Sequence, residues 1–248
     1  MLFNFFYKLR HRPVSYLFPI FFAALAVIAG VMSLSEGRLS AFQKLVLWPI
    51  SWEFFIEMLI AAQCSWLAVS DFAGGTYINI IAAGVGRTKY FFSKLFAILL
   101  TVTVELFAAA TVFLIINFLG GEHAGLTGAQ AGMVTLNLLL MWARHMMLAA
   151  VCVAVCFIAR RLYSMFVCIA VTFVYIFLDS ASSVTETLSW YKIIMRYLPL
   201  GTAKAMRDSL LIGSFSAAGS IASTIPVILI AFAVVMVAVA VFRRADLE

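Results

Sequence analysis

The sequence predicts an all-α membrane protein with six transmembrane helices, and composition and segment length carry this prediction. Hydrophobic residues make up 65% of the 248 residues, only 11% are charged, and the mean hydropathy is +1.09. One core of a soluble domain of this length could not bury so much apolar surface. Six stretches are each long enough to cross the hydrocarbon layer, which takes about 20 apolar residues in a helix.

The six predicted spans share an apolar character and are separated by polar or glycine-rich connections. They are Val14–Leu34, Leu45–Val69, Tyr90–Phe118, Met133–Ala159, Leu162–Ser180 and Ile221–Phe242. An even number of spans places both termini on one side of the membrane. No soluble domain or linker interrupts the pattern, so residues 1–248 are expected to form a single transmembrane domain.

The distribution of Lys and Arg predicts which side faces the cytoplasm. Ten basic residues fall on the side of the termini: Lys8, Arg10, Arg12, Arg87, Lys89, Lys94, Arg160, Arg161, Arg243 and Arg244. Six fall on the other side: Arg38, Lys44, Lys192, Arg196, Lys204 and Arg207. Cytoplasmic loops carry the excess of positive charge, so both termini are predicted to be cytoplasmic. The net charge of +6 then reflects topology and contact with anionic lipid, and no nucleic acid partner is expected.

Two segments outside the spans have the pattern of helices that lie at the membrane interface. Residues 1–12 contain a short predicted interfacial helix, Leu2–Leu9, in which aromatic side chains are followed by basic ones. The long connection 181–220 carries two amphipathic pieces, one before Pro199 and one at Thr202–Ile212. We expect these pieces to lie in the outer interface or to re-enter the membrane.

Ionisable residues inside the spans form a predicted intramembrane polar cluster. Glu53 and Glu57 are four residues apart and share one helix face. Counting about 1.5 Å per residue places Glu57, Glu105, Arg144 and His145 roughly halfway across. Charges at this depth are costly, so they either line a substrate path or subunit interface, or pair to fix helix packing.

No catalytic, metal or nucleotide motif is found in the sequence. The three histidines are scattered, no H-E-x-x-H occurs, and Gly84–Thr88 lacks the spacing and the lysine of a phosphate-binding loop. The four cysteines all lie inside predicted spans without disulfide or zinc spacing, so we interpret them as packing residues: Cys64, Cys152, Cys156 and Cys168. No enzyme activity, metal or cofactor is therefore expected of this chain, and uphill transport would need an ion gradient or a separate motor.

The segment between the second and third spans is the most distinctive of the chain. Asp71 ends the second span, Gly74-Gly75 provide a turn, a short amphipathic helix runs through Ile78 and Ile81, and basic residues precede the third span. A short cytoplasmic helix of this kind can pass motion to a docked partner. The alternative is a plain connector whose Arg87, Lys89 and Lys94 anchor the third helix to anionic headgroups.

This segment, with Gly75-Thr76, Gly86–Tyr90 and Ser93–Leu95, resembles that of ABC-2 type permeases, especially six-span exporters of the lantibiotic and bacteriocin-immunity or peptide-export kind. The resemblance implies a permease subunit of the bacterial cytoplasmic membrane. Its partners would be two copies of a cytoplasmic ATPase, which hold ATP and Mg²⁺, and a second permease chain, either identical or a sister subunit. Its substrate would be an amphipathic or hydrophobic molecule such as a peptide, bacteriocin or drug.

The resemblance also implies roles for particular segments. Residues 72–89 would be the coupling helix seated in the ATPase, and residues 1–12 the elbow helix beside it. The implied ATPase-coupling residues are Asp71, Gly74, Gly75, Thr76, Arg87 and Lys89. Two other hypotheses about the function stay open. One is an ion-coupled carrier that uses Glu53, Glu57 or Glu105, and the other is a non-transport membrane protein such as an assembly subunit.

Overall fold

The computed structural model describes residues 14–37, 39–120, 126–161, 163–181, 209 and 216–244, and the regular structure in this part of the chain is helical. The helices, in chain order, are α2 (Val14–Ser35), α3 (Ala41–Ser51), α4 (Glu53–Ala73), α5 (Thr76–Ala82), α6 (Arg87–Leu119), α7 (Gly128–Ala159), α8 (Tyr163–Ala181) and α11 (Ala217–Arg244). The predicted all-α architecture is therefore confirmed.

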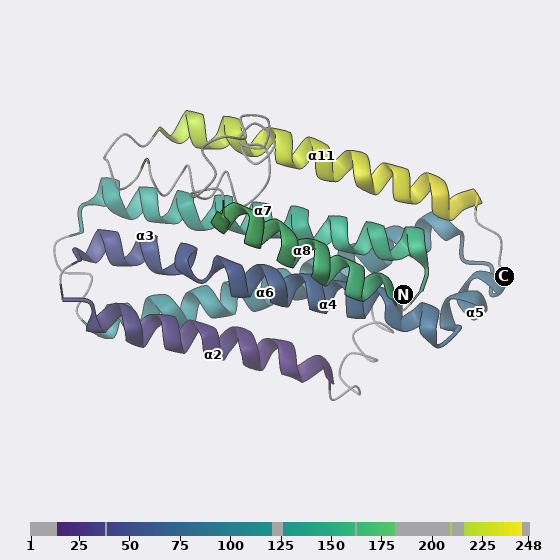
Figure 1. Ribbon diagram of the computed structural model, residues 1–248, viewed down its shortest axis with the longest axis horizontal. Helices are drawn as coiled ribbons and strands as arrows, with labels where there is room; N and C mark the ends of the chain where they lie inside the picture. The colour runs from purple at the N-terminus through teal and green to yellow at the C-terminus, as the bar shows by residue number, and fades with distance from the viewer. Residues whose placement is uncertain are drawn as a thin grey trace.

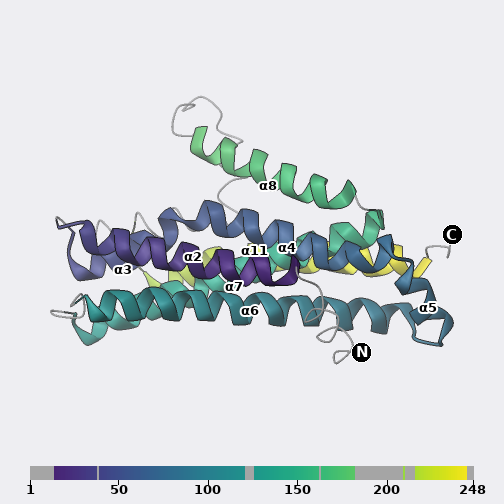
Figure 2. The same ribbon diagram turned by 90° about the horizontal axis from the view of Figure 1, so that it is seen from below.

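The long helices run alongside one another in alternating directions (Figure 1). Helix α7 packs against α4, α6 and α11, and α2 packs mainly along α6. The start of α2, the short α5 and the end of α11 all lie toward the same end of the bundle (Figure 1). Helix α8 leans away from the other helices and contacts α4 and α7 (Figure 2).

Five of the described helices are long and apolar enough to cross a membrane: α2, α4, α6, α7 and α11. Helix α8 contributes a shorter apolar stretch, Tyr163–Val174. Large apolar side chains are exposed on these helices, for example Phe166 and Phe177 on α8 and Phe232 on α11. Such surfaces suit lipid contact, so a multi-pass membrane protein is supported, while the sixth span stays a prediction.

The second predicted span, Leu45–Val69, is not one continuous helix. The chain forms α3 and α4, with Trp52 in a turn between them whose carbonyl accepts hydrogen bonds from the N–H groups of Phe55 and Ile56. Pro49 lies in the last turn of α3. Proline has no N–H to donate, so the last turn of α3 lacks one backbone hydrogen bond, which weakens the helix close to the break. The prediction of an unbroken second span was wrong at this point.

Helix α6 is longer than the membrane requires. Its 33 residues begin at Arg87 rather than at the predicted Tyr90. At about 1.5 Å per residue the helix is about 50 Å long, whereas the hydrocarbon layer is about 30 Å thick. Helix α7, with 32 residues, is similarly long, and Thr127 fixes its start through a capping box with Gln130. Both helices therefore extend beyond the hydrocarbon.

Small residues allow α2 and α6 to approach closely. A Cβ atom added at Gly30 would lie 3.0 Å from Cγ2 of Ile116, and one added at Gly120 would overlap Leu34. Between these contacts the buried Ser33 hydroxyl donates a hydrogen bond to Oδ1 of Asn117. This combination of small side chains and a buried polar pair is typical of helix interfaces within membranes.

Replacing Gly30 by Leu is expected to lower the free energy of unfolding by about 1–3 kcal/mol, because the larger side chain overpacks the seam with Ile116. Gly132→Leu on α7 is the matched control, since nothing lies within 4 Å of a Cβ added there. Thermal unfolding in detergent measures both. Equal melting temperatures for the two variants would contradict the close α2–α6 contact.

The four cysteines are buried free thiols, in agreement with their interpretation as packing residues. Sγ of Cys168 on α8 lies 3.8 Å from the carbonyl oxygen of Cys152. Sγ of Cys156 lies 4.0 Å from the carbonyl oxygen of Ser65. The predicted elbow helix in residues 1–12 lies outside the described residues. So does the predicted re-entrant segment 181–220, apart from Ala181, Ser209 and its last five residues.

Candidate functional site

The connection between α4 and α6 is a compact helical turn. Gly75 has φ +62° and stands immediately before α5, and Gly84, with φ +87°, follows Ala83 at the end of α5. Side chains with a Cβ rarely adopt these left-handed conformations, so glycine is needed at both turns. The short helix that the sequence predicted between the second and third spans is confirmed as α5, Thr76–Ala82.

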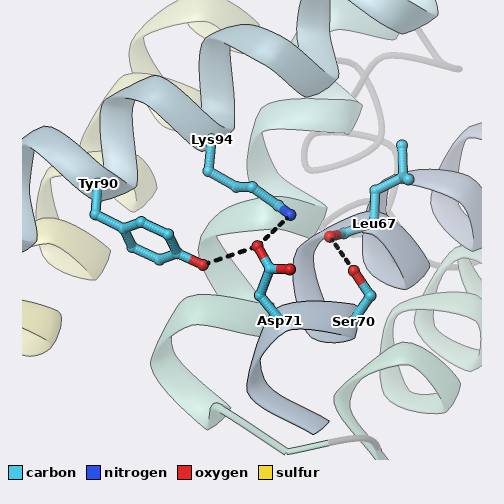
Figure 3. Close-up of polar contacts among 5 residues, drawn as sticks. All are labelled: Leu67, Ser70, Asp71, Tyr90 and Lys94. Atoms are coloured by element: carbon cyan, nitrogen blue, oxygen red, sulfur yellow. Dashed lines mark hydrogen bonds and ion pairs between the residues drawn. The ribbon is translucent and has the colours of Figure 1, made fainter. Parts of the chain in front are cut away.

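A buried ion pair joins the two helices that flank α5 (Figure 3). Oδ2 of Asp71, in the last turn of α4, lies 2.7 Å from Nζ of Lys94 on α6. The hydroxyl of Tyr90 donates to the same oxygen at 3.1 Å. Asp71 and Lys94 are 5% and 7% exposed, so the pair is largely removed from solvent. It fixes the end of α4 against the start of α6.

Aromatic rings connect α5 to four longer helices. Tyr77 of α5 is buried and packs on Phe72 of α4 with ring centroids 4.8 Å apart. Phe72 contacts Phe157 of α7 at 5.0 Å and Phe242 of α11 at 6.2 Å. Tyr90 of α6 contacts both Phe157 and Phe242. We call these five residues the aromatic cluster. A displacement of α5 therefore acts on α4 through Phe72, and on α6, α7 and α11 through the other rings of the cluster.

The sequence-predicted coupling residues separate into an inner and an outer group. Asp71 is buried in the ion pair, whereas Gly74 and Lys89 are exposed, and Gly75 and Thr76 are partly exposed. Arg87 is also partly exposed, and its Nη1 donates to the carbonyl oxygen of Arg243 at 3.0 Å, which ties the start of α6 to the end of α11.

Lys94 was predicted only as a possible lipid anchor, and its pairing with Asp71 was missed. The signal in the sequence that could have indicated this contact is the spacing of Tyr90 and Lys94. Tyr90 and Lys94 are four residues apart and so share a helix face, and that face is turned toward the acidic end of α4.

Four of the five predicted intramembrane residues gather between α4 and α7. Glu53, Glu57, Arg144 and His145 are each at most 2% exposed. Nη2 of Arg144 lies 3.7 Å from Oε1 of Glu53. One ligand atom from each of Glu53, Glu57 and His145 lies within 4.8 Å of the others. We call these four residues the polar cluster. Its two carboxylates and imidazole are also the donor types that hold a divalent metal ion.

The imidazole of His145 is oriented by the backbone of its own helix. Nδ1 lies 2.8 Å from the carbonyl oxygen of Met141, so Nδ1 carries the proton and donates. Nε2 is then left as an acceptor. It is buried and has no hydrogen-bond partner among the described residues.

Glu105, the fifth predicted residue, makes its hydrogen bond elsewhere. Its Oε1 accepts from Nε2 of Gln63 at 2.9 Å, which links α6 to α4. Gln63 is 1% exposed and was not among the residues predicted for the cluster. An uncharged amide gives no charge signal, and at six residues after Glu57, about 120° around the helix axis from it, Gln63 does not share the face of the predicted cluster.

An apolar pocket adjoins the polar cluster. Its volume is about 280 Å³, and it is lined by residues of α2, α6 and α7 together with Trp52 and Ile56. Trp142 and His145 are among the α7 residues in its wall. His145 thus belongs to both the pocket and the polar cluster. This pocket could not be predicted from the sequence, because it is formed by side chains from helices far apart in the chain.

Comparison with known proteins shows the family to which the chain belongs. The family model described as ABC-2 family transporter protein matches residues 4–179, which is more than half of the chain. The chain belongs to the ABC-2 family of transporter proteins. No curated protein matches the sequence. As an ABC-2 permease, the chain is a membrane domain of a type that generally works with a separate ATPase, and α4, α5 and α6 lie within the matched region.

Proposed function

We propose that this ABC-2 permease is the transmembrane subunit of an ATP-driven exporter, with α5 as the element that receives motion from the ATPase. The observation that carries the proposal is the aromatic cluster, in which Tyr77 of α5 packs on Phe72 of α4, and Phe72 packs in turn on rings of α7 and α11. A force on α5 would reach most of the bundle through these contacts.

The proposed assembly has two permease chains, identical or sister subunits, and two cytoplasmic ATPase chains that hold ATP and Mg²⁺. We place it in the bacterial cytoplasmic membrane with both termini in the cytoplasm. Support comes from the excess of basic residues at the α5 end of the bundle. Gly74 and Lys89 belong to the exposed surface of this end, and that surface would face the ATPase.

The proposed substrate is an amphipathic or hydrophobic molecule, such as a peptide, a bacteriocin or a drug, moved outward. The pocket between α2, α6 and α7 supports this class, because nearly all of its lining is apolar. Binding sites for such molecules are mostly apolar with a few placed polar groups, and here His145 is such a group.

The test is to copurify the chain with the ATP-binding subunit encoded beside it and to measure ATP turnover in lipid nanodiscs, with and without an amphipathic peptide. We expect a stable complex whose turnover rises with the peptide. Tyr77→Ala should retain the complex and lose most of the stimulation, because α5 is then detached from the aromatic cluster. Tyr163→Ala is the matched control, since that tyrosine is 57% exposed on α8.

Stimulation that survives Tyr77→Ala unchanged would refute α5 as the transmitting element. Lys89→Glu tests the docking surface separately. This exposed lysine contributes nothing to the core, so a charge reversal should weaken copurification of the ATPase and leave the permease folded. An unchanged yield of the complex would place the docking surface elsewhere.

A second candidate function is an ion-coupled carrier, which the burial of Glu53 and Glu57 favours. Acidic residues at mid-membrane depth mark ion or proton pathways in transporters. This function predicts substrate flux in proteoliposomes driven by a proton or sodium gradient with no ATPase present. Flux that requires the ATPase and ATP would exclude it.

A further inference from the structure

We propose that the pocket between α2, α6 and α7 binds a lipophilic alcohol that enters from the bilayer. The hydroxyl group would donate a hydrogen bond to Nε2 of His145, and the apolar part would fill the rest of the pocket. This inference rests on the proposed export function and narrows its substrate class to uncharged molecules with a hydroxyl group. Fatty alcohols and alkylphenols are members of this class.

The pocket opens on the side of the bundle, between α6 and α7. The exposed residues of its described wall all belong to these two helices: Phe107 and Thr111 of α6, and Thr135 and Leu139 of α7. His145, by contrast, is only 2% exposed. Phe107 and Leu139 lie on helices that are long and apolar enough to cross a membrane, so the opening faces the hydrocarbon layer. A molecule dissolved in that layer therefore reaches the pocket without passing through water.

The described wall of the pocket carries no Asp, Glu, Lys or Arg side chain. Glu53, Glu57 and Arg144 belong to the neighbouring polar cluster and do not line it. A charged group that entered would lose its hydration and gain no ion-pair partner in return, which is unfavourable in a medium of low dielectric constant. The part of a ligand that lies in the pocket is therefore uncharged.

Several hydrogen-bond donors of the wall are already engaged. Nε1 of Trp142 donates to Oγ1 of Thr103 at 3.2 Å. The hydroxyl groups of Thr111 and Thr135 each donate to the carbonyl oxygen four residues earlier on their own helix, so their oxygens are left as acceptors. Trp52 also carries an indole N–H. A hydroxyl group, unlike an ether or an ester, can both donate and accept, and so it suits this wall.

The acceptor that decides the class is Nε2 of His145. Nδ1 of this ring donates to the carbonyl oxygen of Met141 at 2.8 Å, so Nε2 keeps a lone pair and no proton. It is buried and lacks a hydrogen-bond partner among the residues described. Leaving a buried acceptor unpaired costs free energy, which a hydroxyl donor from the ligand would recover. A ligand without a donor would leave this cost in place.

The volume of the pocket limits the size of the ligand. It is about 280 Å³, and a cavity of roughly 150 Å³ holds one benzene molecule. On that scale the pocket holds roughly a dozen carbon atoms. Trp52 and Trp142 line it, so their fluorescence reports on what enters.

The test uses decanol brominated at its terminal carbon, because bromine quenches tryptophan fluorescence on close approach. The full-length permease in lipid nanodiscs is titrated with this alcohol, with its methyl ether, and with the corresponding sulfonate and trimethylammonium compounds. The ether keeps the oxygen but has no donor, and the other two compounds carry a charge of either sign. Empty nanodiscs correct for partition into lipid, and Trp142→Phe identifies the part of the signal that comes from the pocket.

We expect saturable quenching by the alcohol, with an affinity about tenfold above that of the ether, and no saturable quenching by the two charged compounds. His145→Phe should bind the alcohol and the ether equally. Ala110→Phe fills the pocket and should abolish saturable quenching by the alcohol. Ala108→Phe is the matched control and should retain it, because this alanine is exposed and does not line the pocket. Melting temperatures show whether each variant is folded.

Equal affinities of the wild-type permease for the alcohol and the ether would overturn the proposal, and so would saturable binding of either charged compound. This comparison needs no variant, so it decides even if a substitution prevents folding. Quenching by the alcohol that persists in folded Ala110→Phe would place the bound alcohol outside the pocket and would also overturn it. The assay contains no ATPase. A negative result therefore leaves the export function untouched, and failure to find an ATPase partner leaves alcohol binding untouched.

Discussion

Replacing Lys94 by Met is expected to lower the free energy of unfolding by about 3–5 kcal/mol, the range measured when one partner of a buried ion pair is removed. The Asp71 carboxylate would lose the ammonium that lies 2.7 Å away while it remains shielded from solvent. Unfolding by SDS in mixed micelles, followed by circular dichroism, measures the change. Lys89→Met is the matched control, because this lysine is exposed near the same end of α6.

The double variant Asp71→Asn, Lys94→Met separates charge from packing. Removing both charges takes away the uncompensated carboxylate, so the double variant should recover much of the stability that Lys94→Met loses. The Tyr90 hydroxyl, which donates to Oδ2 of Asp71, keeps an acceptor in the asparagine oxygen. Additive losses in the double variant would show that the two side chains do not interact energetically.

Replacing Arg144 by Met is expected to have an effect of similar size, again about 3–5 kcal/mol. The variant removes the cation that lies 3.7 Å from Glu53 and leaves the carboxylates of Glu53 and Glu57 close together and buried. The same SDS titration measures the loss of stability. Arg87→Met, at a partly exposed arginine, is the matched control and should change stability far less.

The pair Glu53→Gln, Arg144→Met gives the complementary test. With one carboxylate neutralised, the cluster no longer carries two negative charges, so part of the stability should return. No recovery would mean that Arg144 stabilises the bundle through packing of its long side chain, as buried arginine stems often do.

Helix positions could be predicted from this sequence because each span is a long apolar run. The start of α2 at Val14 agrees with the prediction, and so does the end of α7 at Ala159. The break at Trp52 could not be read from hydropathy, because Leu45–Val69 is apolar on both sides of it. Pro49 was the local signal, and proline within apolar runs does not always end a helix, since α2 and α11 continue through Pro19 and Pro226.

The polar cluster was largely predictable and the contacts around it were not. Depth counting places Glu57, Arg144 and His145 at one level, and the structure brings them together with Glu53. Depth does not specify the direction around each helix axis, and so Glu105, at a similar level, bonds Gln63 instead. The aromatic cluster was not predicted for the same reason, because it combines rings from helices far apart in the chain.

The length of α6 gives it the geometry of a lever. Near one end it is pinned by the close contact between Gly30 and Ile116, at its middle Leu106 lines the pocket, and near the other end Tyr90 belongs to the aromatic cluster. Measured from Ile116 along the helix axis, Leu106 lies about 15 Å away and Tyr90 about 39 Å away. A pivot at that seam would enlarge a sideways step at Leu106 about 2.6-fold at the level of Tyr90. A small shift of α6 beside a bound molecule would then produce a larger movement of its other end, next to α5.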